Sequence, residues 1–317
     1  MPLNKLLRQG AAMVLMAAAG LAAQAETVRV NYIPILDVTP VFVAIDKGFF
    51  KEQGIDIVTT PSTGGAAGVP GLMAGAYDVM YSNVVSTLLA QQQGFKLKIV
   101  SAGTKQRPGS AATNGLIARK GDNLKTGKDL EGKTVAVNTR NGVIWLYARS
   151  WVAKTGGDPA KVRFKEVPFP QMNDALRSRQ VDAAFNVSPF FGAAIGGTEF
   201  ELVSLPYDVV QPGVEVGQYV TTDDYFTKNQ ALLARYNTAF EKGVAWYNAN
   251  LENPDLRRIV AEFTKMQPDL VAKISLAVLP QKIEMASQLA TAQLMKESGL
   301  LTSDIDVRAM VAPAALK

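Results

Sequence analysis

The chain from residue 28 to residue 65 predicts a β-loop-α-β unit. Apolar and polar side chains alternate over residues 28–32, which predicts a first strand. Apolar positions then recur at helical spacing over residues 41–52, and after Gly54 the run 55–58 predicts a second strand. Because the crossover in such a unit is right-handed, we expect parallel strands, and the loop after the first strand then lies where open α/β sheets bind ligands.

Two series of predicted strands and helices follow along the chain. After the opening unit, the pattern predicts a helix to about residue 76, a strand over 77–81, a helix from Ser82-Asn83 to Gly94 and a strand over 96–101. The second half predicts a strand over 134–138, a helix over 141–154, a strand over 162–167, a helix over 171–179 and a strand over 181–185. The second half therefore repeats the plan of the first.

Two aspartates support this internal repeat. Leu72 precedes Asp78 by six residues, and Leu176 precedes Asp182 by the same interval. Each aspartate lies four residues before a polar residue at the predicted end of its strand, namely Ser82 and Asn186. Chance similarity between two βα units is the alternative to a true repeat.

Two segments rich in glycine and proline, residues 103–115 and 204–217, separate the two series and predict crossings between lobes. From residue 226 onward the pattern is helical, with prolines 254, 268 and 280 suited to the first turns of helices. We therefore expect an α/β fold of two lobes, each a mainly parallel sheet flanked by helices, joined by two hinge crossings. The expected boundaries are 26–110 with 206–317 for lobe I, and 111–205 for lobe II.

The first 25 residues are typical of a cleaved export signal. Lys5 and Arg8 precede the apolar run 11–22, and Ala23-Gln24-Ala25 fits a cleavage site. A membrane anchor is the alternative, but the run is shorter than the roughly 18 residues that a span requires. With 317 residues and 48% apolar content, the remaining chain is long enough for two cores.

The composition excludes several classes of chemistry. The chain has no cysteine, which excludes disulfides and thiol catalysis, and no histidine, the commonest general base and metal ligand. Without a cysteine after the signal we expect no lipid anchor, which favours a periplasm enclosed by a second membrane. The net charge is +5, or +3 once Lys5 and Arg8 are removed, and no basic cluster indicates nucleic-acid binding.

A family resemblance rests on the opening unit. Tyr32-x-Pro34, Asp37 before Pro40, and the run FVAIDKGFFKEQGID resemble the nitrate/sulfonate/taurine group of solute-binding proteins of ABC importers, related to the NMT1/THI5-like proteins. The resemblance extends along nearly the whole chain after the signal. It implies the type 2 periplasmic binding protein fold, a monomer without cofactors, a small-molecule ligand in the interlobe cleft, and an inner-membrane permease with its ATPase as partners.

Small polar residues and glycines recur where a predicted strand ends and a helix begins. Backbone N–H groups at such positions favour an anionic ligand group. With Tyr32 and Asp37 of the first loop, the candidate ligand-binding residues are Ser62, Thr63, Gly64, Ser82, Asn83, Thr139, Arg140, Asn141 and Asn186.

Each candidate also has a structural interpretation, which stays open. Serine and asparagine cap helices, and Asp37 fits an Asx-turn before Pro40. Arg140 fits either a bidentate clamp on a carboxylate or sulfonate, facing the cleft, or a solvated charge. Tyr81, Trp145 and Phe185 are further candidates for an apolar pocket wall, Lys105 and Arg107 for residues that reach the cleft, and Tyr77, Tyr147 and Trp151 for the core.

No catalytic motif is present, and the carboxylates are scattered singly. The first hypothesis is therefore a periplasmic receptor that delivers a small organic anion (a sulfonate, a taurine-like compound or an aromatic carboxylate) to a permease. A protein that binds or synthesises thiamine-pyrimidine precursors is the alternative, although that synthesis relies on histidine. A sensor partner of a membrane kinase is the third possibility.

The signal predicts the mature terminus. Cleavage after Ala25 should leave a soluble, unlipidated chain that begins at Glu26. Intact-mass spectrometry of a periplasmic extract checks this terminus. A chain that still carries residues 1–25, or that carries a lipid, would contradict the prediction.

Overall fold

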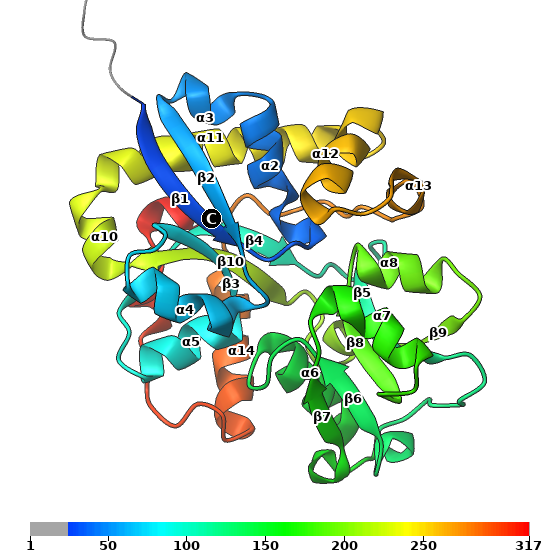
Figure 1. Cartoon of the computed structure of the whole chain (residues 1–317). Coiled ribbons are helices and arrows are strands. Elements are labelled where there is room, and N and C mark those ends of the chain that lie inside the picture. Colours follow the sequence, from blue (N-terminus) through cyan, green and yellow to red (C-terminus); the bar gives the residue numbers. More distant parts are fainter. Residues whose placement is uncertain (1–24, 317) are drawn as a thin grey trace, which may run out of the picture.

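The computed structural model describes residues 25–316, so the predicted export signal lies outside the described residues except for its last residue. Figure 1 shows two α/β lobes side by side, with the chain passing between them twice. One lobe is built on a sheet from the first part of the chain and the other on a sheet from its middle. None of the helices in residues 25–316 is long and apolar enough to cross a bilayer.

The first sheet has five strands in the order β2-β1-β3-β10-β4. Strands β1, β2 and β3 pair in parallel, whereas β10 is antiparallel to both of its neighbours. The strands are β1 (Glu26–Tyr32), β2 (Ile55–Pro61), β3 (Val79–Asn83), β4 (Leu97–Lys105) and β10 (Glu215–Thr222).

The second sheet has the equivalent order, β7-β6-β8-β5-β9, with β5 antiparallel to both neighbours. Its strands are β5 (Asn114–Arg119), β6 (Thr134–Val137), β7 (Arg163–Glu166), β8 (Ala183–Val187) and β9 (Phe200–Ser204). In each sheet the single antiparallel strand is the first strand that follows a crossing from the other lobe. The predicted α/β class with mainly parallel sheets is therefore confirmed.

Helices cover both sheets. On the first lobe they are α2 (Thr39–Asp46), α3 (Phe49–Glu52), α4 (Gly65–Met73), α5 (Val84–Gln92), α10 (Asp223–Lys228), α11 (Gln230–Ala249), α12 (Pro254–Thr264), α13 (Pro268–Val271), α14 (Met285–Glu297) and α15 (Val307–Met310). On the second lobe and its return crossing they are α6 (Val143–Lys154), α7 (Phe169–Arg177), α8 (Phe190–Ile195) and α9 (Pro206–Val210). Helix α11 packs on α2 and α3, and α14 packs on α5, so the C-terminal part of the chain returns to the first lobe.

Asp78 and Asp182 hold equivalent places in the two sheets. Asp78 accepts the backbone N–H of Arg29 in β1, and its own N–H donates to the carbonyl of that residue. Asp182 makes the same pair of hydrogen bonds with Thr134 in β6. The internal repeat predicted from the spacing of these aspartates is therefore present in the fold, where each carboxylate fixes the start of a central strand.

Several predicted boundaries were wrong for local reasons. The helix predicted over 41–52 is two helices, α2 and α3, because Gly48 adopts φ 75° between them. Each crossing is shorter than predicted, because β4 continues to Lys105, β5 begins at Asn114, and α9 forms inside the return segment. Pro254 and Pro268 begin helices as predicted, but no helix begins at Pro280.

The predicted core aromatics are buried. Trp151 and Tyr147 lie on the inner face of α6, and Tyr77 is buried beside α4, where its hydroxyl donates to the carbonyl of Gly68. Trp145 lies beside the inner face of α6 and is half-buried. Its ring packs edge-on against Phe164, with the ring centroids 6.2 Å apart. The helical spacing of apolar residues in this helix was therefore a good guide to its packing.

Removal of the Asp78 carboxylate should destabilise the protein more than removal of the Asp182 carboxylate. Asp78 is 5% exposed and accepts three hydrogen bonds from Arg29, whereas Asp182 is 34% exposed and accepts one from Thr134. Asp78→Ala should lower the free energy of unfolding by about 2–3 kcal/mol, and Asp182→Ala by less. Denaturant unfolding checks the order, with Asp56→Ala on the exposed face of β2 as the control. An equal loss in all three variants would contradict it.

Candidate functional site

The two lobes meet at the ends of their parallel strands. A cavity of about 80 Å³ lies between them. The first lobe contributes the residues that follow β1 and β2, and the second contributes those that follow β7 together with the start of α8. The lining residues are Ile33, Pro34, Ile35, Ser62, Thr63, Pro168, Phe169, Pro170 and Phe190. Open α/β sheets bind ligands at this edge, where the parallel strands end. Here the corresponding edges of the two sheets face each other across the cavity.

Direct contacts hold the lobes in a closed arrangement. The backbone N–H of Leu36 donates to the carbonyl of Ser188 at 3.0 Å, and Asn138 Nδ2 donates to the carbonyl of Thr63 at 3.4 Å. A Cβ at Gly64 would lie 2.7 Å from Thr139 Cγ2 and 2.9 Å from Asn138 Nδ2. A side chain at residue 64 would therefore require Thr139 and Asn138 of the opposite lobe to shift.

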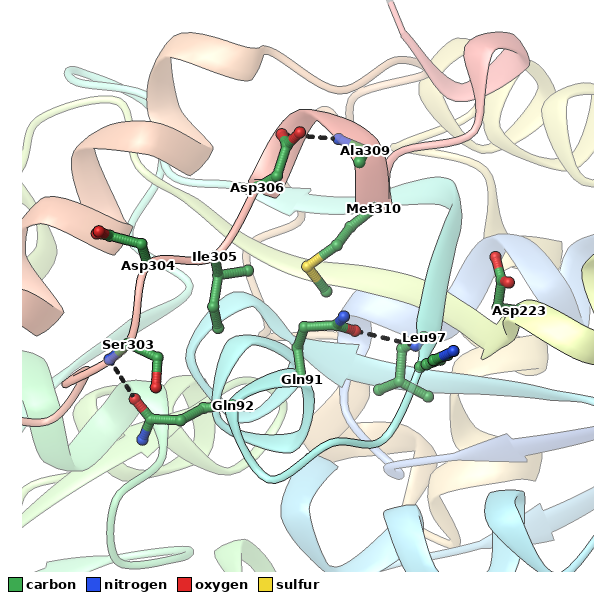
Figure 2. Close-up of a pocket in the computed structure, with 11 residues that line it drawn as sticks. Gln91, Gln92, Leu97, Asp223, Ser303, Asp304, Ile305, Asp306, Ala309 and Met310 are labelled. Carbon is green, nitrogen blue, oxygen red and sulfur yellow. Dashed lines mark hydrogen bonds between the residues drawn. The ribbon is translucent and has the colours of Figure 1, made fainter.

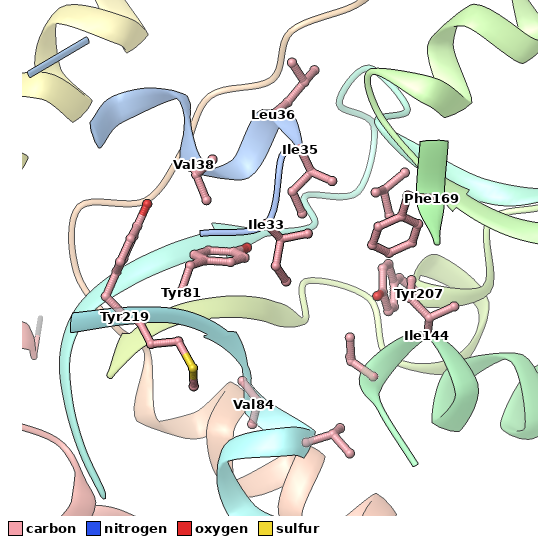
Figure 3. Close-up of a cluster of buried hydrophobic side chains, with 14 of the residues drawn as sticks. Ile33, Ile35, Leu36, Val38, Tyr81, Val84, Ile144, Phe169, Tyr207 and Tyr219 are labelled. Atoms are coloured by element: carbon pink, nitrogen blue, oxygen red, sulfur yellow. The ribbon is translucent and has the colours of Figure 1, made fainter. Parts of the chain in front are cut away.

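Apolar side chains form most of the walls between the lobes. Figure 3 shows Ile33, Ile35 and Val84 of the first lobe on one side, with Ile144, Phe169 and Tyr207 on the other. All six are buried. Such walls favour a ligand with an apolar or aromatic body, since ligand pockets are mostly apolar with a few placed polar groups.

Two helices begin at this junction without a side-chain cap. Helix α4 follows Gly64, and α6 follows Gly142. The Gly65 backbone lies so close to β3 that a Cβ there would be 2.5 Å from Ser82 Oγ. The first N–H groups of an α-helix lack partners within the helix, and both starts lie beside Thr139, which Gly64 and Gly142 each approach.

The structure brings four of the predicted site residues together. Ser62 and Thr63 of the first lobe line the cavity, and Gly64 beside them lies against Thr139 of the second lobe. Asn138, which was not among the candidates, makes the hydrogen bond across the gap. Thr139 Oγ1 is buried without a partner in the described chain, so it is available to a ligand.

Three other candidates have structural roles. Asn83 caps α5, because its Oδ1 accepts the backbone N–H of Ser86 at 2.8 Å. Asn186 is fully buried and bonds to Asn173 and to the backbone of its own segment. Ser82 is fully buried beside Gly65. The helix-capping interpretation therefore applies to Asn83, and a packing role applies to the other two.

Arg140 and Asn141 do not lie where the sequence predicted. Strand β6 ends at Val137 and α6 begins only at Val143, so both residues belong to an exposed loop. Asn141 takes φ 57°, and the backbone N–H of Arg140 donates to Glu166 Oε1 at 2.5 Å. The prediction that Arg140 faces the cleft is not supported, because Arg140 is exposed in this loop and does not line the cavity.

Tyr32 also lies apart from the cavity. Its ring packs edge-on against Phe42 of α2, with the centroids 4.9 Å apart, and is half-buried there. Phe185, another aromatic candidate on a strand, is fully buried. Of the two basic candidates near the first crossing, Lys105 pairs with Glu284 at 2.5 Å and Arg107 is exposed.

Asp37 lies at the hinge end of the cleft and makes no Asx-turn. Its Oδ2 accepts the Tyr81 hydroxyl at 2.6 Å, and that hydroxyl is 3.0 Å from Thr104 Oγ1. Burial raises the pKa of the Asp37 carboxyl, although the hydrogen bonds from Thr104 and Tyr81 oppose the shift. Among residues 25–316, no lysine or arginine forms an ion pair with it.

The sequence analysis missed most of the apolar lining. Phe169 and its flanking prolines follow β7, and Phe190 follows β8. The run Val167-Pro168-Phe169-Pro170 directly after a predicted strand was a usable signal, because it occupies a strand end in the second lobe. Tyr207, in contrast, lies in the return crossing and gave no signal.

A larger groove, of about 390 Å³, lies elsewhere on the first lobe (Figure 2). It is formed by the end of α5, the start of β4 and the segment before α15. Its glutamines are occupied, since Gln91 Oε1 accepts the N–H of Leu97 and Gln92 Oε1 accepts that of Ser303. The part of the chain that the structure describes contains no cluster of three acidic residues suited to a metal ion.

Comparisons with known proteins agree with this geometry. A family model described as NMT1/THI5 like matches residues 35–255. The putative binding protein YtlA of Bacillus subtilis is 24% identical over 287 residues, which is 85% of this chain and 82% of that protein.

Solved structures share the fold. The alkanesulfonate-binding protein SsuA from Xanthomonas axonopodis, bound to MOPS, superposes with a TM-score of 0.75 at 18% identity, over 92% of this chain and 99% of that one. The periplasmic nitrate-binding protein NrtA from Synechocystis superposes with a TM-score of 0.76 at 14% identity, over 90% and 85%. At these identities the likeness establishes the architecture alone.

A side chain at position 64 should prevent full closure. Gly64 has an extended φ of 176°, so Gly64→Val does not strain the backbone, but the side chain would collide with Thr139 of the other lobe. Overpacking of this kind costs about 1–3 kcal/mol, which is about fivefold or more in affinity. Small-angle scattering of the ligand-saturated protein should show a larger radius of gyration than the parent.

The matched control is Gly197→Val, where an added Cβ meets ordinary contacts at 3.6 Å and beyond. That variant should close and bind like the parent. A Gly64→Val protein that is as compact as the parent would show that the lobes tolerate a side chain at this contact.

Proposed function

Since this chain belongs to the NMT1/THI5-like family, we propose that it is the periplasmic substrate-binding component of an ABC importer. It captures a small organic solute between lobe I (26–110 with 206–317) and lobe II (111–205). It then delivers the solute to a permease and its ATPase in the inner membrane. It does so as a monomer, released into the periplasm by signal cleavage.

The observation that carries this proposal is the closed junction between the two sheets. The strand ends of both lobes face one cavity, and Gly64 is packed against Asn138 and Thr139 of the opposite lobe. Two short crossings are the covalent links between the sheets. An arrangement of this kind binds by hinge closure, provided that the ligand prefers the closed state.

We propose a small organic anion as the solute. The uncapped starts of α4 and α6 supply backbone N–H donors from opposite lobes, and the apolar walls accommodate an alkyl or aryl body. A sulfonate, a taurine-like compound or an aromatic carboxylate meets both conditions. Arg140, being exposed, is not needed for this recognition.

A thiamine-pyrimidine protein of the same fold is the second candidate. The half-buried carboxylate of Asp37 favours it, because a carboxylate accepts hydrogen bonds from an aminopyrimidine. A synthetic enzyme of that kind is disfavoured, since the chain has no histidine. We therefore propose a transport role without catalysis.

Binding of the correct anion should raise the melting temperature. At a hundred times the dissociation constant a ligand stabilises the folded state by about 2.7 kcal/mol, which is a shift of roughly 5–10 °C for a chain of this size. The panel is alkane- and arylsulfonates, taurine, aromatic carboxylates and nitrate, with the corresponding alcohols as uncharged controls. If no anion shifts the transition while an aminopyrimidine does, the second candidate replaces the first.

Arg140→Ala should leave the affinity for the best anion within about threefold of the parent, because an exposed charge contributes little. Calorimetry on the purified variant checks this expectation. A loss of thirtyfold or more would show that the loop 138–142 turns inward when the ligand binds.

A further inference from the structure

The hinge end of the cleft holds hydrogen-bond acceptors that lack donors. We propose that Asp37, Tyr207 and Asp208 form a subsite for a hydrogen-bond donor of the solute, such as an ammonium, amidinium or amide N–H group. This inference rests on the proposed function and narrows its ligand class. The solute is then an organic anion that also carries such a donor.

Asp37 is the first part of this subsite. Its carboxylate is held by two hydroxyls, those of Tyr81 and Thr104, and by no cation within residues 25–316. Asp37 is half-buried, and a carboxylate that is largely removed from water is normally paired, because taking a charge out of water is expensive. A cationic or strongly donating group on the ligand would supply the missing partner.

The space beside Asp37 is small. A cavity of about 10 Å³ lies there, lined by the start of η1 (Leu36–Val38), the end of β4 including Lys105, the first crossing, Tyr247 of α11 and the segment 277–279. That volume is about the size of one water molecule, so it admits an ammonium or amide nitrogen but no larger group.

Tyr207 is the second part. It is 1% exposed, and its hydroxyl has no partner in the described chain. The ring is fixed by Tyr147 and Phe185, at centroid distances of 4.8 and 5.2 Å. Figure 3 shows the hydroxyl on the side of the ring that faces Ile33 and Tyr81, and thus the space between the lobes.

Tyr81 connects Tyr207 with Asp37, because the Tyr207 hydroxyl is turned toward Tyr81 in Figure 3 and the Tyr81 hydroxyl donates to Asp37 Oδ2. Burial raises the pKa of the Tyr207 hydroxyl well above its ordinary value, and the charges of Tyr147 and Asp37 raise it further. A neutral phenol next to a carboxylate can accept one hydrogen bond from a ligand and donate another. The two groups therefore suit a ligand nitrogen placed between them.

Asp208 extends the same polar region along the crossings. Its Oδ2 accepts Gln106 Nε2 at 3.4 Å, and Gln106 Oε1 accepts Asn114 Nδ2 at 2.9 Å. Each end of this series of hydrogen bonds has one oxygen that is buried without a donor in the described chain. These atoms are Asp208 Oδ1 and Asn114 Oδ1. The unsatisfied groups here are thus mostly acceptors, whereas the opposite end of the cleft offers the N–H donors of α4 and α6.

Matched pairs of probes isolate the donor. We choose 4-aminobenzenesulfonate with benzenesulfonate, 4-aminobenzoate with benzoate, and taurine with ethanesulfonate. In at least one pair the amino compound should bind the purified full chain about tenfold more tightly or better, because a site built to hydrogen-bond a group rejects the analogue that lacks it. Calorimetry measures both members of each pair.

Two variants assign the preference to the subsite. Asp37→Asn and Tyr207→Phe should each remove most of it, while the affinity for the parent anion stays within about threefold. Tyr207→Phe should leave the melting temperature of the empty protein unchanged or raised, because it deletes only a buried hydroxyl without a partner. A purely structural role for Tyr207 predicts no change in ligand preference.

The control is Tyr236→Phe, which deletes another buried hydroxyl without a partner, on α11 beneath the first sheet and away from the cleft. It should change neither affinity nor preference. Equal affinities within every pair, or a preference that survives both subsite variants, would overturn this inference and leave the importer role intact. A chain that binds no member of any pair would overturn the anion proposal itself and this inference with it.

Discussion

The structure depends on two strands that each enter the opposite sheet against its direction. β5 lies between β8 and β9, and β10 lies between β3 and β4. The first strand after each crossing is therefore hydrogen-bonded along both of its edges. The lobes are thereby tied to each other through their sheets rather than through a loose linker. Residues on the crossings consequently keep a defined place in the cleft, as Tyr207 and Asp208 do.

The close approach of β4 and β10 connects this constraint to the site. A Cβ at Gly103 would lie 2.5 Å from the carbonyl carbon of Gly217, and one at Gly217 would lie 1.8 Å from Tyr81 Oη. The missing side chain at Gly217 therefore makes room for the Tyr81 hydroxyl, which in turn holds Asp37. Buried acceptors without donors lower the stability of the empty protein, and functional sites commonly retain such local costs for the sake of binding.

The sequence predicted features that depend on neighbours along the chain, and it missed features that depend on distant contacts. Alternation and helical spacing were sufficient for the strands, for the core side of α6 and for the repeat at Asp78 and Asp182, because each is a local pattern. The orientation of Arg140 was not predictable in this way. It follows from the αL residue Asn141 and from a backbone hydrogen bond to Glu166, which lies 26 residues away.

The placement of the two ends of the cleft relative to the hinge has a mechanical consequence. In the proposed hinge motion, groups on the crossings would move little, whereas Gly64 and Thr139, which touch from opposite lobes, would separate. An anion bound as we propose, between the starts of α4 and α6, would lose one of these two helix starts when the cleft opens. A ligand donor bound by Asp37 and Tyr207 would keep its partners. In this proposal the acceptor-rich end determines which solute binds, and the helix starts determine how strongly binding favours the closed state.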